Sequence, residues 1–426
     1  MKILKGNILQ FCDNPFTTEI EKSYRILNNS GLVIKNNKIH EIDVFKRLKD
    51  KYPEARVYDY GQNLISSGFI DCHIHYPQAA IISSYGERLL TWLNKYTFPE
   101  EIKFTDYSYS KKIASFTLDQ FLKNGVTTMS SFCTTSMESV DAFFSEANKR
   151  SMSVVAGKTC MDRNAPNKLT DNVETSYNDS EKLINKWHLK GRLKYAISPR
   201  FAPTSTNEQL KALGQLWSKY PDCIMQTHLG EQKEEIEWVK ELFPNAKDYL
   251  SVYEKYNLIG KNAIFGHSIY LTEREIQSLN ESHSSIAHCP TSNMFIGSGL
   301  FNLRNLINKI NIGIASDIGG GTSLSMFNNM ATSYKIAQLV GSSIHPAQLH
   351  WLATMGSAKS LGLENQIGNI KIGNYADLII IDLSSTKIIE LRKSYAKNFW
   401  EEYFPTIMMG DDRAIKSTWV SGIKAF

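Results

Sequence analysis

The sequence predicts an α/β fold: a (β/α)8 TIM barrel with a small β-sandwich domain formed by both chain termini. From residue 65 to about 316, short apolar segments with strand character alternate with helical segments, which is typical of a parallel sheet covered by helices. Eight such units suit a closed barrel of roughly 250 residues. We place the composite β-sandwich at 1–66 and 372–426, and the barrel at 67–371.

The first 65 residues contain short strands and turns. The apolar segments 32–34 and 38–42 flank Asn36-Asn37, a pair suited to a hairpin turn. Near the other end, a turn precedes an apolar strand within 372–382, and a late strand follows within 417–423. We expect these late strands to pair with the N-terminal ones.

The barrel strands are expected at eight positions: 65–75, 126–132, 153–159, 193–198, 223–228, 263–267, 285–288 and 312–316. Two of the intervening helices carry an N-terminal signature. Thr206 and Gln209, and likewise Thr272 and Glu275, have the spacing of a capping box. Since these signatures come just after predicted strands, they support the alternation of strands and helices.

Composition indicates an ordinary globular protein. Of 426 residues, 42% are hydrophobic and 21% charged, and the net charge of +5 comes from mixed, scattered charges. We therefore expect no nucleic-acid partner. The six cysteines are widely spaced without a Cys-x-x-Cys, and no apolar run has the length of a signal peptide or membrane span. The expected location is the reduced cytoplasm, with no membrane association.

A metal site is indicated where the first barrel strand ends. Alternate residues of a strand share a face, so His73 and His75 point the same way. A single His-x-His is more often two ordinary histidines. Here His228, His267 and Asp317 end three later strands, and active sites of such barrels lie at that end. Three or more imidazoles and a carboxylate predict a transition-metal site, most often zinc.

Glu231 is a candidate for proton transfer because it follows His228 by only three residues. A carboxylate beside a metal, but not bound to it, can move a proton between water and substrate. The alternative is a solvated glutamate at a helix N-terminus. We expect one metal, since the fourth strand has no lysine at its end and Lys194 comes too early to bridge two ions.

Arg200, Gln78 and Phe201 are candidates for substrate recognition. Arginine presents a planar fork of donors, glutamine both donates and accepts, and phenylalanine offers a face for stacking. A surface salt bridge for Arg200 and core packing for Phe201 are the alternatives. His288, at the end of the seventh strand, is expected to orient ligands or substrate.

The chain resembles the amidohydrolase superfamily of metal-dependent hydrolases and, within it, the guanine deaminases. The resemblance rests on His73-Ile74-His75, His228, His267, Ser316-Asp317 and the following motifs: residues 71–78, 90–100, 157–162, 198–202, 226–231 and 288–300. It implies hydrolysis of guanine to xanthine and ammonia, in which hydroxide on the metal attacks C2. It also implies a homodimer and one Zn2+ per chain, with Fe2+ as another possible metal.

The same resemblance implies roles for the candidate residues. It places the metal on His73, His75, His228 and Asp317, and makes Glu231 the proton shuttle. It makes His267 either a ligand or a polarising group that contacts the substrate, and Gln78, Arg200 and Phe201 the purine-binding residues. The alternatives are a deaminase of 8-oxoguanine, cytosine or a pterin, and a catalytically silent scaffold of the same fold.

Overall fold

The structure is a computed structural model that describes residues 1–86 and 88–426. The chain forms two units, each described by itself below. One consists of Met1–Ile70, Gln120–Thr128 and Leu324–Phe426, and the other of Asp71–Asp119 and Met129–Ser323. This division into two units does not test the domain boundaries expected at 66 and 371, which stay a prediction.

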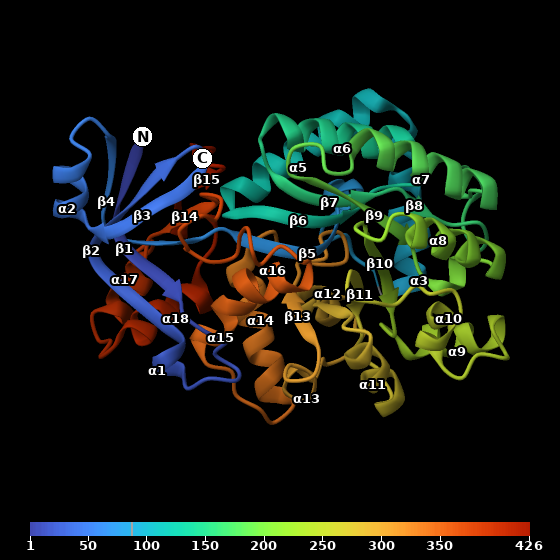
Figure 1. The fold of residues 1–426 in the computed structure, drawn as a ribbon. Coiled ribbons are helices and arrows are strands. Elements are labelled where there is room, and N and C mark those ends of the chain that lie inside the picture. Colours follow the sequence, from blue (N-terminus) through green and yellow to red (C-terminus); the bar gives the residue numbers. More distant parts are fainter. Residues whose placement is uncertain (87) are drawn as a thin grey trace. The chain divides into compact units, whose positions relative to one another are not determined.

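The barrel sheet contains the eight expected strands in sequence order, together with the two-residue strand β8 (Thr159–Cys160), which pairs with β9. From β7 onward neighbouring strands pair in parallel. The strands are β5 (Phe69–His75), β6 (Val126–Phe132), β7 (Ser153–Gly157), β9 (Leu193–Pro199), β10 (Ile224–Leu229), β11 (Ala263–His267), β12 (Ser285–His288) and β13 (Asn311–Ile314). The predicted (β/α)8 fold is confirmed (Figure 1).

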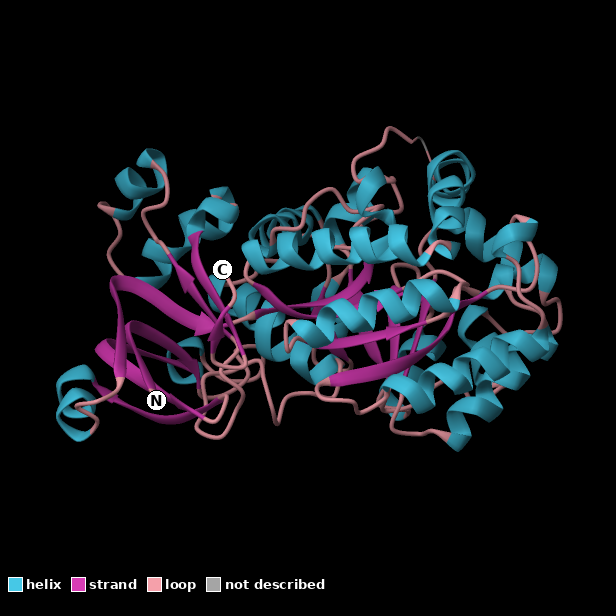
Figure 2. Ribbon diagram, turned by 90° about the horizontal axis from the view of Figure 1, so that it is seen from above, coloured by secondary structure: helices cyan, strands magenta, loops and turns pink. Residues whose placement is uncertain are grey.

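Helices lie between most of these strands and surround them (Figure 2). They are α3 (Leu89–Trp92), α4 (Phe98–Glu101), α5 (Tyr107–Lys123), α6 (Met137–Lys149), α7 (Val173–Trp187), α8 (Asn207–Lys219), α9 (Lys233–Leu242), α10 (Tyr249–Glu254), α11 (Glu273–Glu281), α12 (Pro290–Phe295) and α13 (Leu303–Leu306). In the part of the chain that the structure describes, no helix combines the length and apolar character needed to span a membrane.

The two expected N-caps both form, but in different ways. At α11 the Thr272 and Glu275 side chains bond reciprocally to each other's backbone N–H, which is a complete capping box. At α8 the Thr206 hydroxyl accepts from Gln209 N–H, while the Thr206 N–H donates to Asp162 Oδ1 at 2.7 Å. The Asp162 carboxylate thus takes the place that the Gln209 side chain was expected to fill.

The terminal strands pair with one another as expected. They are β1 (Lys2–Phe11), β2 (Tyr24–Lys35), β3 (Lys38–Val44), β4 (Arg56–Ser67), β14 (Leu378–Ile381), β15 (Ile415–Val420) and β16 (Ile423–Lys424). Their order is β16-β15-β14-β4-β1-β2-β3 in a single sheet. This sheet is the separate β unit of both termini that the sequence predicts: β1 pairs with β2 on one side and β4 on the other, and β4 also pairs with β14 from the C-terminal part.

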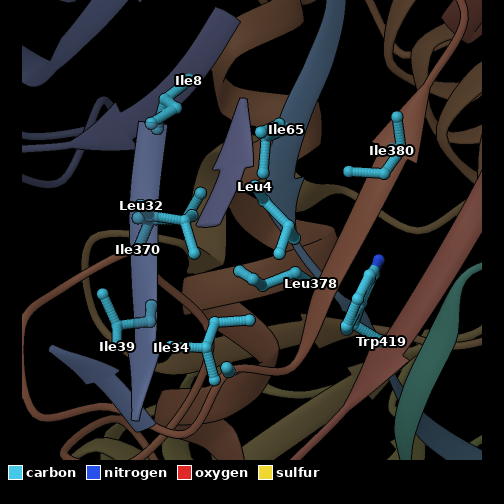
Figure 3. Packing of buried hydrophobic residues seen from close by; sticks show 11 residues of the cluster. Leu4, Ile8, Leu32, Ile34, Ile39, Ile65, Ile370, Leu378, Ile380 and Trp419 are labelled. Carbon is cyan, nitrogen blue, oxygen red and sulfur yellow. The ribbon is translucent and has the colours of Figure 1, made fainter. Parts of the chain in front are cut away.

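Both faces of this sheet are covered. Leu4 and Leu32 belong to a buried cluster on one face, which Figure 3 shows with side chains from β1, β2, β4, β14 and β15. Ile3 and Val33 are their neighbours in sequence and so point to the other face, where they pack with Leu48 of α2 (Phe45–Lys51). Burial on both faces explains why residues 32–34 of β2 form a continuous apolar run.

The turn between β2 and β3 forms at the predicted pair. Asn36 and Asn37 have φ angles of +50° and +66°, as the two central residues of a type I′ hairpin require. The remaining helices of this unit are short or follow the barrel: α1 (Ile20–Ser23), α14 (Met326–Leu339), α15 (Pro346–Trp351), α16 (Ser357–Ser360), α17 (Lys387–Lys393) and α18 (Phe399–Met409).

Candidate active site

The barrel brings three predicted ligands into direct contact. His73 Nε2 and His75 Nε2, from the end of β5, lie 3.2 and 3.1 Å from His228 Nε2 on β10. Asp317, three residues beyond β13, places Oδ1 at 3.5 Å from Nε2 of both His73 and His75. All four side chains are buried or nearly so. Four donor atoms from three strand ends therefore converge on one point.

The spacing of these donors fits a metal ion. With metal–nitrogen distances of about 2.0–2.1 Å, ligands at the corners of a tetrahedron lie about 3.3–3.4 Å apart. The His228 Nδ1–H donates to the Arg200 carbonyl at 2.6 Å, so its Nε2 carries the lone pair that faces the other donors. Lone pairs directed at each other repel unless a cation lies between them.

Electrostatics point the same way. Burial, followed by the mutual repulsion of the clustered imidazoles, holds the pKa values of His73, His75 and His228 well below the ordinary value, which keeps these imidazoles neutral. Burial raises the pKa of the Asp317 carboxyl to about 7. A bound cation would offset that penalty by favouring the ionised carboxylate.

His267 lies beside the four donors. Its Nδ1–H donates to Asn293 Oδ1 at 2.8 Å, and its Nε2 lies 3.6 Å from Glu231 Oε2 and 3.7 Å from Asp317 Oδ2. Burial disfavours the charged imidazole, but the carboxylates of Glu231 and Asp317 outweigh burial and raise the pKa of His267. His267 can therefore contact either a metal or a polar atom of a substrate.

The backbone is strained at two of these positions. His267 and Asp317 have φ angles of +63° and +49°, in the left-handed region that residues other than glycine rarely adopt. Such conformations persist where the surrounding structure fixes them, often at functional sites. Both residues end or follow a barrel strand, so this backbone turns their side chains toward the cluster.

Glu231 is buried and held on two sides. Its Oε1 accepts from the Ser298 hydroxyl at 2.8 Å, and its backbone N–H donates to Glu235 Oε2 at 2.8 Å. Gly230 has a φ of +56°, which allows the sharp turn that brings Glu231 back toward His267. A solvated surface position for Glu231, the alternative from sequence, does not fit this burial.

Asp71 joins the first and last barrel strands next to the cluster. Its Oδ1 accepts from Ser316 N–H at 3.0 Å, and Asp317 N–H donates to the His73 carbonyl at 2.9 Å. These two bonds link residues that are more than 240 positions apart in the chain. The first and last strands of the barrel are thus joined beside the donor atoms, and we call this junction of Asp71 and His73 with Ser316 and Asp317 the seam.

A pocket opens onto the donors. One wall is apolar and comes from α3 and the residues after it. The pocket is lined by His75, Gln78, Leu89, Trp92, Leu93, Arg200, Phe201, His228, Glu231, His267, Ile296, Asp317 and Gly320. All three substrate-binding candidates therefore face the same space as the donors.

Arg200 and Gln78 meet at a third side chain. Arg200 Nη1 lies 3.0 and 2.9 Å from the two carboxylate oxygens of Glu101, and Gln78 Nε2 donates to Glu101 Oε1 at 2.9 Å. All three residues are buried. The surface salt bridge considered for Arg200 is thus replaced by a buried ion pair beside the pocket.

Two other candidates occupy less polar surroundings. Phe201 is 5% exposed and its ring lies 6.5 Å from that of His228, so it both packs in the core and lines the pocket. The ring of His288 stacks on Phe301 at 4.5 Å, and its buried Nδ1 has no partner among the described residues. The orienting role expected for His288 finds no hydrogen bond to support it at this nitrogen.

The sequence reasoning did not single out Glu101, Asn293 and Ser298. Glu101 directly follows the motif at 90–100, while Asn293 and Ser298 lie inside the motif at 288–300. Their contacts to Arg200, His267 and Glu231 join segments far apart in the chain. Their position in or next to these motifs was the one signal in the sequence, and it does not show which side chains they contact.

Comparison with known proteins places these features in a family. Residues 64–424 match the Amidohydrolase family. The chain is 43% identical to the guanine deaminase of Escherichia coli (strain K12), over 99% of this chain and 97% of that protein. It superposes on the solved E. coli guanine deaminase with a TM-score of 0.98 at 42% identity, covering 100% of this chain and 99% of that one. A guanine deaminase from C. acetobutylicum, solved with bound guanine in the active site, gives a TM-score of 0.90 at 32% identity and full coverage of both chains.

Proposed function

Because the chain belongs to the amidohydrolase family and, within it, to the guanine deaminases, we propose that it hydrolyses guanine to xanthine and ammonia in purine catabolism or salvage. The observation that carries this proposal is the buried donor cluster of His73, His75, His228 and Asp317, which opens onto a pocket together with Glu231, Arg200 and Gln78. A silent scaffold has no chemical need for this combination.

The four donors would hold one divalent metal, Zn2+ in our proposal, with Fe2+ as a chemically suitable substitute. Such a metal acts as a Lewis acid and makes water nucleophilic near neutral pH. His228 is fixed as a neutral ligand by its bond to the Arg200 carbonyl. The seam formed by Asp71 and His73 holds Asp317 beside the histidines.

The residues around the cluster would carry the proton transfers. Glu231 accepts a proton from the attacking water as the water oxygen bonds to C2 of guanine, and delivers it to the adjacent ring nitrogen. The new hydroxyl on C2 then gives its proton to Glu231, which passes it to the amino nitrogen. The bond from C2 to that nitrogen breaks, so that ammonia leaves and C2 keeps a carbonyl oxygen. Ser298 keeps one Glu231 oxygen engaged, which leaves Oε2 on the side of His267.

The substrate would lie between the donors and the apolar wall. Arg200 donates to O6 of guanine, Gln78 contacts the neighbouring N1–H, and Phe201 borders the ring. His267 either completes the metal site or polarises the attacked carbon. The homodimer and the cytoplasmic location implied by the family resemblance are part of this proposal.

The direct test is ammonia release by purified protein loaded with Zn2+. We expect guanine to be the preferred substrate over 8-oxoguanine, cytosine, a pterin and adenine when kcat/KM is compared at equal metal content. Preference for another base would replace guanine as the substrate, and no release from any base would favour the scaffold alternative.

A second prediction concerns Arg200. Replacing it by alanine removes the proposed donor to O6, and should lower kcat/KM for guanine roughly tenfold to a hundredfold, or about 1.5–3 kcal/mol. 2-Aminopurine lacks the 6-oxo group and should lose much less, because no acceptor is left unpaired. Arg200→Lys should restore only part of the activity, since a point charge cannot reproduce the planar fork.

The matched control for this prediction is Arg163→Ala. Arg163 donates Nη2–H to the Ala202 carbonyl but does not line the pocket. The Arg163→Ala substitution should leave the ratio of kcat/KM for guanine to kcat/KM for 2-aminopurine unchanged. An equal loss for both substrates in Arg200→Ala would mean that Arg200 supports the fold and does not read O6.

A further inference from the structure

A buried carboxylate holds both polar side chains that the proposed function assigns to substrate recognition. Glu101, at the last position of α4, is 1% exposed. Its Oε1 accepts from Gln78 Nε2, and both of its oxygens lie within 3.0 Å of Arg200 Nη1. Phe98, one turn earlier, lies 5.7 Å from the Arg200 guanidinium. The short helix α4 thus supports Arg200 with a charge and with a ring face.

The chemistry of Glu101 fixes which way the Gln78 amide faces. A carboxylate only accepts hydrogen bonds, so the Gln78 NH2 group must point to Glu101. The acceptor Oε1 is then left for the other side, where Gln78 borders the pocket. A Cβ added to Gly319 would come within 2.0 Å of this Oε1, so the amide is packed against the loop after Asp317.

Glu101 also determines which Arg200 donors remain available. The contacts to Glu101 use Nη1 alone. In residues 1–86 and 88–426, Nε and Nη2 of Arg200 have no hydrogen-bond partner in the protein, and Arg200 lines the pocket. Arginine carries five N–H donors and no acceptor. The pocket therefore receives donors from Arg200 and an acceptor from Gln78.

We propose that Glu101 is a positioning residue that fixes this arrangement of Arg200 donors and Gln78 acceptor. It thereby makes the pocket select a 6-oxo purine over a 6-amino purine. The inference rests on the proposed function and extends it. A 6-oxo purine presents the acceptor O6 next to the donor N1–H, which matches a donor from Arg200 and an acceptor from Gln78. A 6-amino purine presents a donor next to the acceptor N1, the opposite pattern.

Glu101→Gln tests this assignment with little change in shape. The new amide can donate as well as accept, so the Gln78 amide is no longer held in one orientation, and Arg200 loses its charged partner. Guanine and 2,6-diaminopurine are the two substrates that show which group at C6 the pocket prefers. They carry the same 2-amino leaving group and differ in the group at C6.

We expect Glu101→Gln to lower kcat/KM for guanine at least tenfold and to narrow the guanine preference over 2,6-diaminopurine by about the same factor. Glu101→Asp keeps the charge and the acceptor-only character and should retain more of the preference. The control is Glu275→Gln, a buried glutamate that caps α11 and accepts from Leu250 N–H. It should not change the preference, even if it lowers stability.

A binding measurement gives the same information without turnover. Hypoxanthine and adenine both lack the 2-amino group and differ as 6-oxo and 6-amino purines, so their inhibition constants report discrimination directly. We expect wild type to favour hypoxanthine and Glu101→Gln to reduce that ratio about tenfold. A ratio unchanged in Glu101→Gln, or near one in wild type, would overturn the role of Glu101. Failure of the proposed function would differ, because wild type would then release no ammonia from guanine.

Discussion

The Glu231→Gln substitution is expected to lower kcat for guanine by about a hundredfold to ten-thousandfold, the range for loss of a general acid–base group. The amide keeps the shape of Glu231 and can still contact Ser298 Oγ and His267 Nε2. It cannot take a proton from water near neutral pH. Metal content and guanine binding should therefore remain close to wild type, and the loss should appear in kcat.

Single-turnover kinetics and guanine titration of the Glu231→Gln protein measure these two effects separately. The matched control is Glu234→Gln, three residues further along at an exposed position of α9. This change should leave both kcat and KM within about twofold of wild type, as is usual for surface substitutions. Near-normal turnover by Glu231→Gln would remove Glu231 from the mechanism.

Removal of the metal is the second change with a very large expected effect. Dialysis against a chelator should abolish ammonia release, since the Lewis acid contributes several kcal/mol to the reaction. One equivalent of Zn2+ per chain should restore it, because the four donors surround a single point. Elemental analysis of active protein should find one transition metal per chain.

A pair of histidine variants makes this experiment specific. His228→Ala removes a central donor and should abolish both metal binding and activity. His188→Ala removes a histidine whose Nε2 contacts Asp222, outside the pocket, and should retain the metal. Two metals per active chain, or activity that survives metal removal, would contradict the single-metal site.

Much of the fold could be predicted because its signals are local. The barrel strands show as apolar segments at regular intervals, and Thr272 and Glu275 form the cap that their spacing indicates. The pairing of N-terminal with C-terminal strands was expected, but the order of the strands in their sheet was not. That order depends on which edges pair, and the β1–β4 pairing joins segments that a sequence pattern does not connect.

The candidate site, too, could be predicted from the sequence only in part. His73, His75, His228 and Asp317 could be proposed because each ends a strand, and parallel strands bring their ends together. Their roles as ligands stay a prediction. Glu101 could not be found, because its function depends on contacts with Gln78 and Arg200 that only the folded chain creates. An acidic residue on a helix gives no sign in sequence that it will be buried.

The seam at Asp71 has a consequence for how the protein is made. His73 and His75 leave the ribosome about 240 residues before Ser316 and Asp317, whose N–H groups bond to Asp71 and to the His73 carbonyl. A nascent chain that ends before β13 already contains three of the four proposed donors but lacks both Asp317 and the N–H groups that bond to Asp71 and His73. Completion of the proposed metal site and closure of the barrel are thus expected to be one late event of synthesis, and a chain truncated before Asp317 should have neither.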